Sequence, residues 1–202
     1  ALLLDNIEWF CRLRWLAVSF LAFFALAGRL LPNLIGEMRF SAGTDWAFAV
    51  AFLLALGNLL FSVHGRTMRR SQAVRHAKTN LWLQIVTDLV LMTIVVHCVG
   101  GRETNIHTGY VFHVVLACIF FSPRESFKVV LTAILLFSSC LILEETGVLT
   151  NTQGFGPNSP SRVPMWVLNV NLAATQAVWL VVWYLGSHLS GMLRSRDQEL
   201  AI

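Results

Sequence analysis

The hydrophobic positions along this chain fall in long continuous runs, separated by short polar stretches. About 20 apolar residues in helical conformation cross the hydrocarbon core of a bilayer, and six runs approach that length. Continuous runs do not fit the alternating strands of a membrane β-barrel. The predicted spans are residues 13–34, 46–64, 80–99, 105–122, 127–147 and 165–190. The pattern therefore predicts an all-α polytopic membrane protein, a bundle of six transmembrane helices.

Composition supports this class. Of the 202 residues, 56% are hydrophobic and only 13% are charged, and the mean hydropathy is +0.65. These values are typical of a membrane protein and exclude an ordinary soluble domain. The segments between the spans are too short to hold one. We divide the chain into a transmembrane domain, residues 1–190, and the start of a cytoplasmic signalling helix, residues 191–202.

The basic residues lie mainly on one side of the predicted bundle. The formal net charge is +4, and this asymmetry accounts for it without a nucleic-acid partner. Because cytoplasmic segments carry the excess of Lys and Arg, we expect both termini to be cytoplasmic, in a bacterial inner membrane, with lipid as the surrounding partner. The residues on the cytoplasmic side are Arg12, Arg14, Arg66, Arg69, Arg70, Arg75, Lys78, Arg124, Lys128, Arg194 and Arg196.

The sixth predicted span does not stop at the membrane boundary. Apolar residues continue at coiled-coil spacing past the interface, and no Pro interrupts them. The seam consists of Val182, Leu185, Leu189, Met192, Leu193 and Leu200. Gly186 with Ser190, and Ser187 with Gly191, add the small-residue spacing that permits close helix contact. We expect this helix to pair in a homodimer and to carry motion out of the bilayer; an ordinary frayed helix end is the alternative.

Polar side chains inside the third span require an explanation, because burying them in a membrane is costly. Gln84 and Asp88 are four residues apart and share a helix face. Asp88 lies near mid-membrane, so we expect it to be neutral or paired. His97 follows nine residues later, which is about half a turn around the helix. Asp88 and His97 therefore point to opposite sides.

A second group of polar residues gathers at the predicted outer end. Helical side chains tilt toward the helix N-terminus, so His97 and His113, on antiparallel spans, lean toward one level, where Glu144 also points. Three interpretations remain open: interhelical hydrogen bonds, a pocket for a small ligand or quinone, or a divalent metal (His97, His113, Glu144) or haem site. The candidate ligand-binding residues are His97, Gly100, Gly101, Thr104, Asn105, His107, Tyr110, His113, Glu144 and Asn169.

Several short motifs occur in one order along nearly the whole chain. They are Leu13-Arg14-Trp15-Leu16, Asp88, His97, Gly100-Gly101, Phe112-His113, Ser122-Pro123-Arg124, Leu143-Glu144, Gly147-Val148-Leu149, and the exit helix from Leu193-Arg194 to Glu199-Leu200. With these motifs the chain resembles the six-helix N-terminal membrane region of bacterial sensor histidine kinases of the redox-sensing RegB/PrrB type. In the redox-sensing members, the Gly-Gly turn continues as Asn-Pro-Phe and is implicated in ubiquinone sensing. Here Thr104-Asn105-Ile106 stands in that place.

The resemblance implies a sensory input module of a two-component system. It implies a kinase domain later in the same polypeptide and a response regulator as its partner, and no catalytic residue within these 202 residues. Two other classes stay open. One is a small transporter whose path passes Gln84, Asp88 and the histidines. The other is a membrane redox protein, such as a b-type cytochrome, that uses His97 and His113.

Overall fold

A computed structural model describes residues 2–31, 45–71, 74–101, 104–149 and 164–200. Every regular element in this described part is helical, which confirms the all-α prediction. The elements are α1 (Leu2–Leu30), α3 (Asp45–Ser71), α4 (Val74–Val99), the 3₁₀ helix η1 (Asn105–Thr108), α5 (Gly109–Phe120), α6 (Pro123–Glu145) and α7 (Met165–Leu200).

Five of these helices are long and apolar enough to cross a membrane, which makes the chain a membrane protein by length and composition. The candidate spans are Glu8–Leu30, Asp45–Thr67, Lys78–Val99, Pro123–Glu145 and Asn169–Leu193. The fourth predicted span is shorter, because η1 and α5 together cover only Asn105–Phe120. The twelve residues of α5 are about 18 Å long and the four residues of η1 add about 8 Å, against roughly 30 Å for a hydrocarbon core. Five of the six predicted spans therefore coincide with helices of full membrane-spanning length, and the fourth is a shorter apolar helix.

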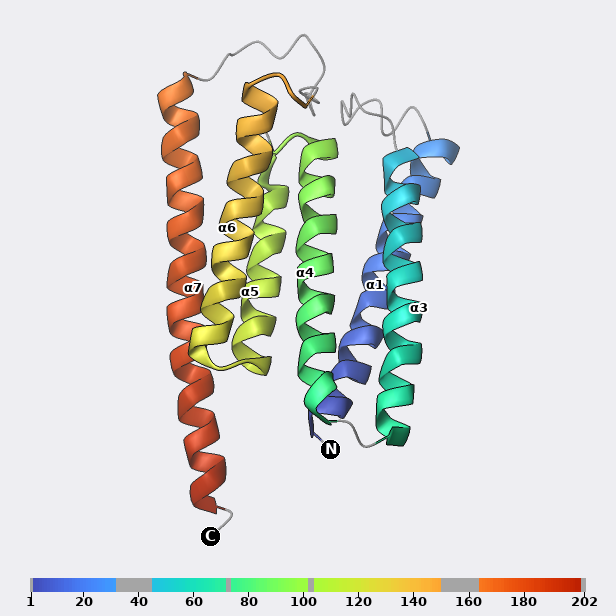
Figure 1. The fold of residues 1–202 in the computed structure, drawn as a ribbon. Coiled ribbons are helices and arrows are strands. Elements are labelled where there is room, and N and C mark those ends of the chain that lie inside the picture. The colour runs from blue at the N-terminus through green and yellow to red at the C-terminus, as the bar shows by residue number, and fades with distance from the viewer. Residues whose placement is uncertain (1, 32–44, 72–73, 102–103, 150–163, 201–202) are drawn as a thin grey trace.

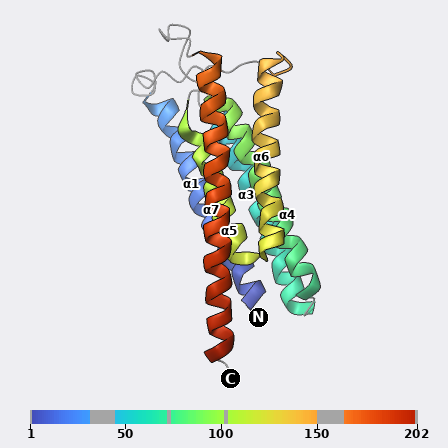
Figure 2. The same ribbon diagram turned by 90° about the vertical axis from the view of Figure 1, so that its left-hand side faces the viewer.

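Helix α4 occupies the middle of the molecule. It contacts α1 and α3 on one side and α5 and α6 on the other. Helix α7 packs against α5 and α6 at the far edge, and its last turns project beyond the other helices (Figures 1 and 2). The end of α7 lies at the same end of the bundle as the beginning of α1 (Figure 1). Helix α4 therefore lies between two groups of helices: α1 and α3 form one, and α5, α6 and α7 form the other.

The Gly-Gly turn after α4 has a local physical cause. Gly100 has φ 90°, a left-handed conformation that strains any residue with a Cβ atom. A Cβ on Gly101 would lie only 2.7 Å from Cγ1 of the buried Val96. Thr104 then donates both its backbone N–H and its hydroxyl to the carbonyl of Gly100. The two glycines are required by the turn itself, whatever else the turn does.

The turn between α5 and α6 marks the opposite end of the bundle. Pro123 stands in the first turn of α6, after Ser122 in an extended conformation, as the missing N–H and fixed φ of Pro favour. Lys78 Nζ lies 2.5 Å from Glu125 Oε1. Lys78 is the first residue of the apolar span of α4. The ion pair therefore places the α5–α6 turn beside the beginning of that span, and α5 lies alongside the apolar part of α4.

Two helices begin earlier in the sequence than the membrane spans predicted for them. Helix α1 begins at Leu2 and not at residue 13, so its basic residues belong to the helix and not to a connection before it. Helix α6 begins at Pro123 and not at residue 127. Helix α7 runs without a break through residue 190, which is the continuation past the sixth span that the sequence pattern predicted.

Candidate functional site

The best-formed polar contact inside the bundle joins α1 to α4. Arg14 Nε donates to Asp88 Oδ2 at 2.9 Å, and Nη2 donates to Asp88 Oδ1 at 2.7 Å. Only 4% of the Arg14 side chain and 7% of the Asp88 side chain are exposed. This is the paired alternative predicted for Asp88. Arg14, which we assigned to the cytoplasmic charge excess, is instead its buried partner.

The surroundings of this pair supply a further acceptor for Arg14 and two aromatic rings beside its guanidinium. Arg14 Nη2 also donates to the backbone carbonyl of Gln84 at 2.7 Å. The guanidinium lies 5.0 Å from the ring centres of both Phe10 and Phe61, a cation–π arrangement favoured away from water. Gln84 itself is fully buried and donates to Asn80 Oδ1. The result is a buried charged pair that is surrounded by hydrogen-bonding groups and aromatic side chains.

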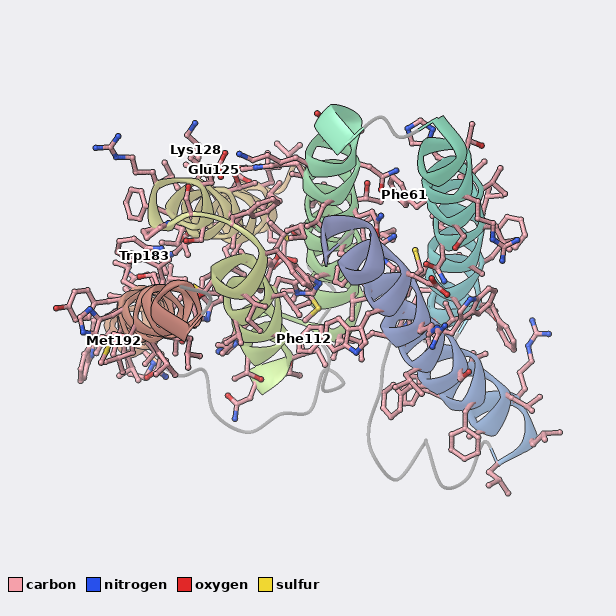
Figure 3. All side chains as sticks on the ribbon, turned by 90° about the horizontal axis from the view of Figure 1, so that it is seen from below. Phe61, Phe112, Glu125, Lys128, Trp183 and Met192 are labelled. Carbon is pink, nitrogen blue, oxygen red and sulfur yellow. The ribbon has the colours of Figure 1, made fainter. Side chains whose placement is uncertain are left out.

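A cavity of about 160 Å³ adjoins the pair and contains His113. We call it the His113 cavity. It is lined by residues of α1, α3, α4 and α5, including Arg14, Asp88, Met92 and Phe112. Seen along the bundle, Phe112 points from α5 toward α1 (Figure 3). His113 therefore belongs with Asp88. Our prediction that it shares a site with His97 and Glu144 is wrong, because α5 turns it toward α1.

A second polar cluster joins the last turns of α4 and α6. His97 Nδ1 lies 2.6 Å from Glu144 Oε1, and the thiol of Cys140 lies 3.8 Å from the same oxygen. We call this the His97 cluster. The predicted meeting of His97 with Glu144 is confirmed, and so is the placement of Asp88 and His97 on opposite faces of α4.

A third site lies at the same end of the bundle, between α6, α7 and the Gly-Gly turn. This cavity of about 170 Å³ has both polar and apolar walls; we call it the α6–α7 cavity. It is lined by Gly101, His107, Phe137, Ser138, Leu141, Ile142, Glu145, Asn169, Asn171, Leu172 and Thr175. His107 Nε2 lies 3.3 Å from the hydroxyl of Thr175. Three predicted site residues, Gly101, His107 and Asn169, are brought together here.

The other four predicted site residues are part of the helix packing, of the Gly-Gly turn or of η1. Tyr110 is fully buried, its hydroxyl lies 2.6 Å from Thr93 Oγ1, and its ring packs against Phe137 and Trp179. Gly100 and Thr104 form the turn described above. Asn105 begins η1 and is exposed. None of these four lines either cavity.

Sequence reasoning missed Arg14, Cys140 and Thr175 as members of these clusters. Arg14 had a usable signal, because it lies six residues inside the apolar span that begins at Glu8. Cys140 stands four residues before Glu144 and so shares its face. Thr175 carries no signal in the sequence, since only the packing of α7 on α6 brings it to His107.

The chemistry of the clusters bears on the ligands we considered. A haem held by two histidines needs both on facing helices around one space, and His97 and His113 lie in different surroundings. The α6–α7 cavity offers amide, hydroxyl and imidazole groups beside an apolar wall, which suits a small ring with polar substituents.

Comparison with known proteins gives no relative: no family model matches the chain, and neither does any curated protein or solved structure.

Proposed function

We propose that this chain is the membrane sensory input module of a bacterial two-component sensor histidine kinase in the inner membrane, with both termini cytoplasmic. A small molecule or redox-active compound from the membrane or the periplasm, with quinones as the first candidate class, binds the α6–α7 cavity. Helix α7 passes the change to a kinase domain later in the same polypeptide, which phosphorylates a response regulator.

One observation carries this proposal: the same helix walls the cavity at one end and projects from the bundle at the other. Asn169, Asn171 and Thr175 of α7 line the cavity. The helix then continues unbroken to Leu200, beyond the level of the α5–α6 turn (Figure 1). A ligand that binds one position of α7 better than another shifts the population of that position, and a continuous helix transmits the shift to its other end.

The size and lining of the cavity support a ring-shaped ligand. An apolar cavity of about 150 Å³ in another protein binds benzene, so about 170 Å³ accepts one six-membered ring. Phe137, Leu141 and Leu172 provide the apolar wall, while Thr175 and His107 provide hydrogen-bonding groups on one side. These are the requirements of a quinone head group whose tail extends into lipid.

The surface of α7 supports a homodimer. Leu185 and Leu189 of the predicted seam are 59% and 60% exposed, whereas Val182 packs against the core of its own chain. Gly186 also serves its own chain, since a Cβ there would lie 3.3 Å from Cys118 Sγ on α5. We therefore place the dimer seam on the leucines and not on the small residues.

The test uses the full-length protein in inverted membrane vesicles. The first requirement is that the coding sequence beyond Ile202 encodes a kinase domain. Autophosphorylation is then measured as a short-chain ubiquinone is added, for the wild type and for Thr175→Val. Loss of one hydrogen bond of about 1 kcal/mol raises the half-effective quinone concentration about fivefold.

The matched control is Thr132→Val, the same change at an exposed position of α6 whose hydroxyl donates to its own helix backbone. It is expected to respond like the wild type. A full-length protein without a kinase domain, or equal responses of Thr175→Val and wild type to quinone, contradicts the proposal.

The Arg14–Asp88 region favours a second candidate, a small transporter. Ionisable pairs within a membrane often mark transport paths, and the His113 cavity lies beside this pair. In the described part of the chain, Asn58 Oδ1 and Asn80 Nδ2 are buried without a hydrogen-bond partner on the side of Gln84. Substrate-driven flux in reconstituted vesicles that Asp88→Asn abolishes is the result expected of a transporter.

A further inference from the structure

We propose that the His97 cluster binds a divalent transition-metal ion, best matched by Zn²⁺, through His97, Cys140 and Glu144. The proposal stands on this cluster alone and does not depend on the sensory role proposed above. It also replaces the set His97, His113 and Glu144 considered from the sequence, since His113 lies in a different cavity.

The three side chains converge from two parallel helix ends. Cys140 and Glu144 stand one turn apart on the face of α6 that meets α4, and His97 faces them from the last turn of α4. One ligand atom of each lies within 4.8 Å of the other two. Because all three sit on regular helices and not on loops, their backbone positions are fixed before any ion arrives.

The distances are near those of a zinc centre. Zinc binds imidazole nitrogen and carboxylate oxygen at about 2.0 Å and thiolate sulfur at about 2.3 Å. Tetrahedral angles then separate the ligand atoms by about 3.3–3.6 Å. The structure has 2.6 Å between His97 Nδ1 and Glu144 Oε1, and 3.8 Å between Cys140 Sγ and the same oxygen. The third separation, between a His97 ring nitrogen and Cys140 Sγ, is at most 4.8 Å. Side-chain displacements of a few tenths of an ångström to just over about 1 Å therefore bring the three atoms to tetrahedral separations.

The donor set selects the class of ion. Imidazole, thiolate and carboxylate together suit zinc and related ions, whereas magnesium and calcium prefer oxygen alone. Binding releases the thiol proton of Cys140 to solvent. The proton between His97 Nδ1 and Glu144 Oε1 also leaves this contact, either to His97 Nε2 or to solvent, so that both atoms can bind the ion. Three protein ligands leave one tetrahedral position for water or another small ligand.

Two of the three ligands are buried, and the third is partly exposed and gives the ion access to the site. The side chains of Glu144 and Cys140 are almost fully buried, at 4% exposed for each. The side chain of His97 is 21% exposed, so the ion can enter at that side. Val96 and Leu141 are buried neighbours along the chain of these ligands, and they keep the local surroundings apolar, which strengthens the attraction of a carboxylate and a thiolate for a cation.

The test uses Co²⁺ as a spectroscopic substitute for Zn²⁺ with the purified, reduced full chain in detergent. We expect one Co²⁺ per chain, a sulfur-to-cobalt charge-transfer band, tetrahedral d–d bands in the visible, and loss of all bands when Zn²⁺ is added. Cys140→Ser is expected to abolish the charge-transfer band. Glu144→Gln, which keeps the side-chain shape, is expected to weaken Co²⁺ binding at least tenfold.

The matched control is Cys98→Ser, which removes a half-buried thiol beside His97 that lies near Cys140 but outside the cluster. It is expected to keep the wild-type spectrum. Tryptophan fluorescence and gel filtration show whether each variant is folded. The proposal is overturned if the wild type gives no charge-transfer band, if folded Cys140→Ser keeps it, or if Glu144→Gln binds Co²⁺ as the wild type does. Loss of the band in Cys98→Ser alone would also reject the ligand set.

Discussion

The two faces of α4 carry polar clusters of different kinds. Toward α1, Asp88 receives two hydrogen bonds from Arg14, and rings of two phenylalanines lie beside the guanidinium. Toward α6, the ring nitrogen Nδ1 of His97 and the thiol of Cys140 both approach the same carboxylate oxygen of Glu144. The first cluster is a matched pair of opposite charges, and the second is a convergence of ligand atoms. This difference indicates that the Arg14–Asp88 pair holds α1 and α4 together, whereas the His97 cluster is suited to bind a ligand.

Breaking the matched pair is expected to have the largest effect on stability. Arg14→Ala leaves Asp88 buried without its counter-charge, and loss of one partner of a buried pair costs about 3–5 kcal/mol. Thermal unfolding in detergent, followed by tryptophan fluorescence, measures the loss. The double variant Arg14→Ala with Asp88→Ala is expected to be more stable than Arg14→Ala, because no isolated charge remains.

Arg12→Ala is the control for this experiment. Arg12 is two residues away on the same helix, 77% exposed, and paired with Glu8. An exposed pair of this kind contributes about 0.3–0.5 kcal/mol. Equal losses for Arg12→Ala and Arg14→Ala would show that the Arg14–Asp88 pair is not a buried support of the bundle.

Breaking the second cluster is expected to cost less. Glu144→Ala removes the oxygen that both His97 and Cys140 approach, and a hydrogen bond to a charged group contributes about 1.5–3 kcal/mol. The same unfolding assay is run with and without Zn²⁺. If the cluster binds metal, Zn²⁺ raises the melting temperature of the wild type and not that of Glu144→Ala. A Zn²⁺ effect of equal size on both would assign the stabilisation to another part of the protein.

The Gly-Gly turn that leads from α4 toward the α6–α7 cavity can be tested with one methyl group. Gly101→Ala places a Cβ against the buried side chain of Val96, and overpacking of this kind is expected to cost about 1–2 kcal/mol. The same change in the middle of α3, Gly57→Ala, meets only Phe61 at 4.0 Å. It is expected to stabilise the helix by up to about 1 kcal/mol. Opposite signs in thermal unfolding are the outcome that supports the turn geometry.

The smallest effect is expected at the opposite end of the bundle. Lys78 and Glu125 form an ion pair whose side chains are 52% and 25% exposed. Lys78→Met is expected to change the free energy of unfolding by only about 0.2–1 kcal/mol, and less in high salt. A loss as large as that of Arg14→Ala would mean that the level of the α5–α6 turn depends on this pair.

Some features of the site followed from the sequence because helix geometry is local. The nine-residue step from Asp88 to His97 placed them on opposite faces of α4, and both were found there. The same reasoning failed for His113, since its partner depends on which neighbour α5 faces. That choice is made by packing between helices far apart in the sequence, which periodicity within one helix does not contain.

The sequence by itself determined the class of this protein, because apolar runs of about 20 residues have one stable arrangement in a bilayer, the helix. It also determined the Gly-Gly turn and the need for Asp88 to be either neutral or paired. Only the tertiary structure decided that the partner is Arg14, that Cys140 joins His97 and Glu144, and that α7 walls a cavity. The hydrogen-bonding contacts that define these clusters join residues 47 to 74 positions apart, and their energies depend on burial that exists only once the helices have packed.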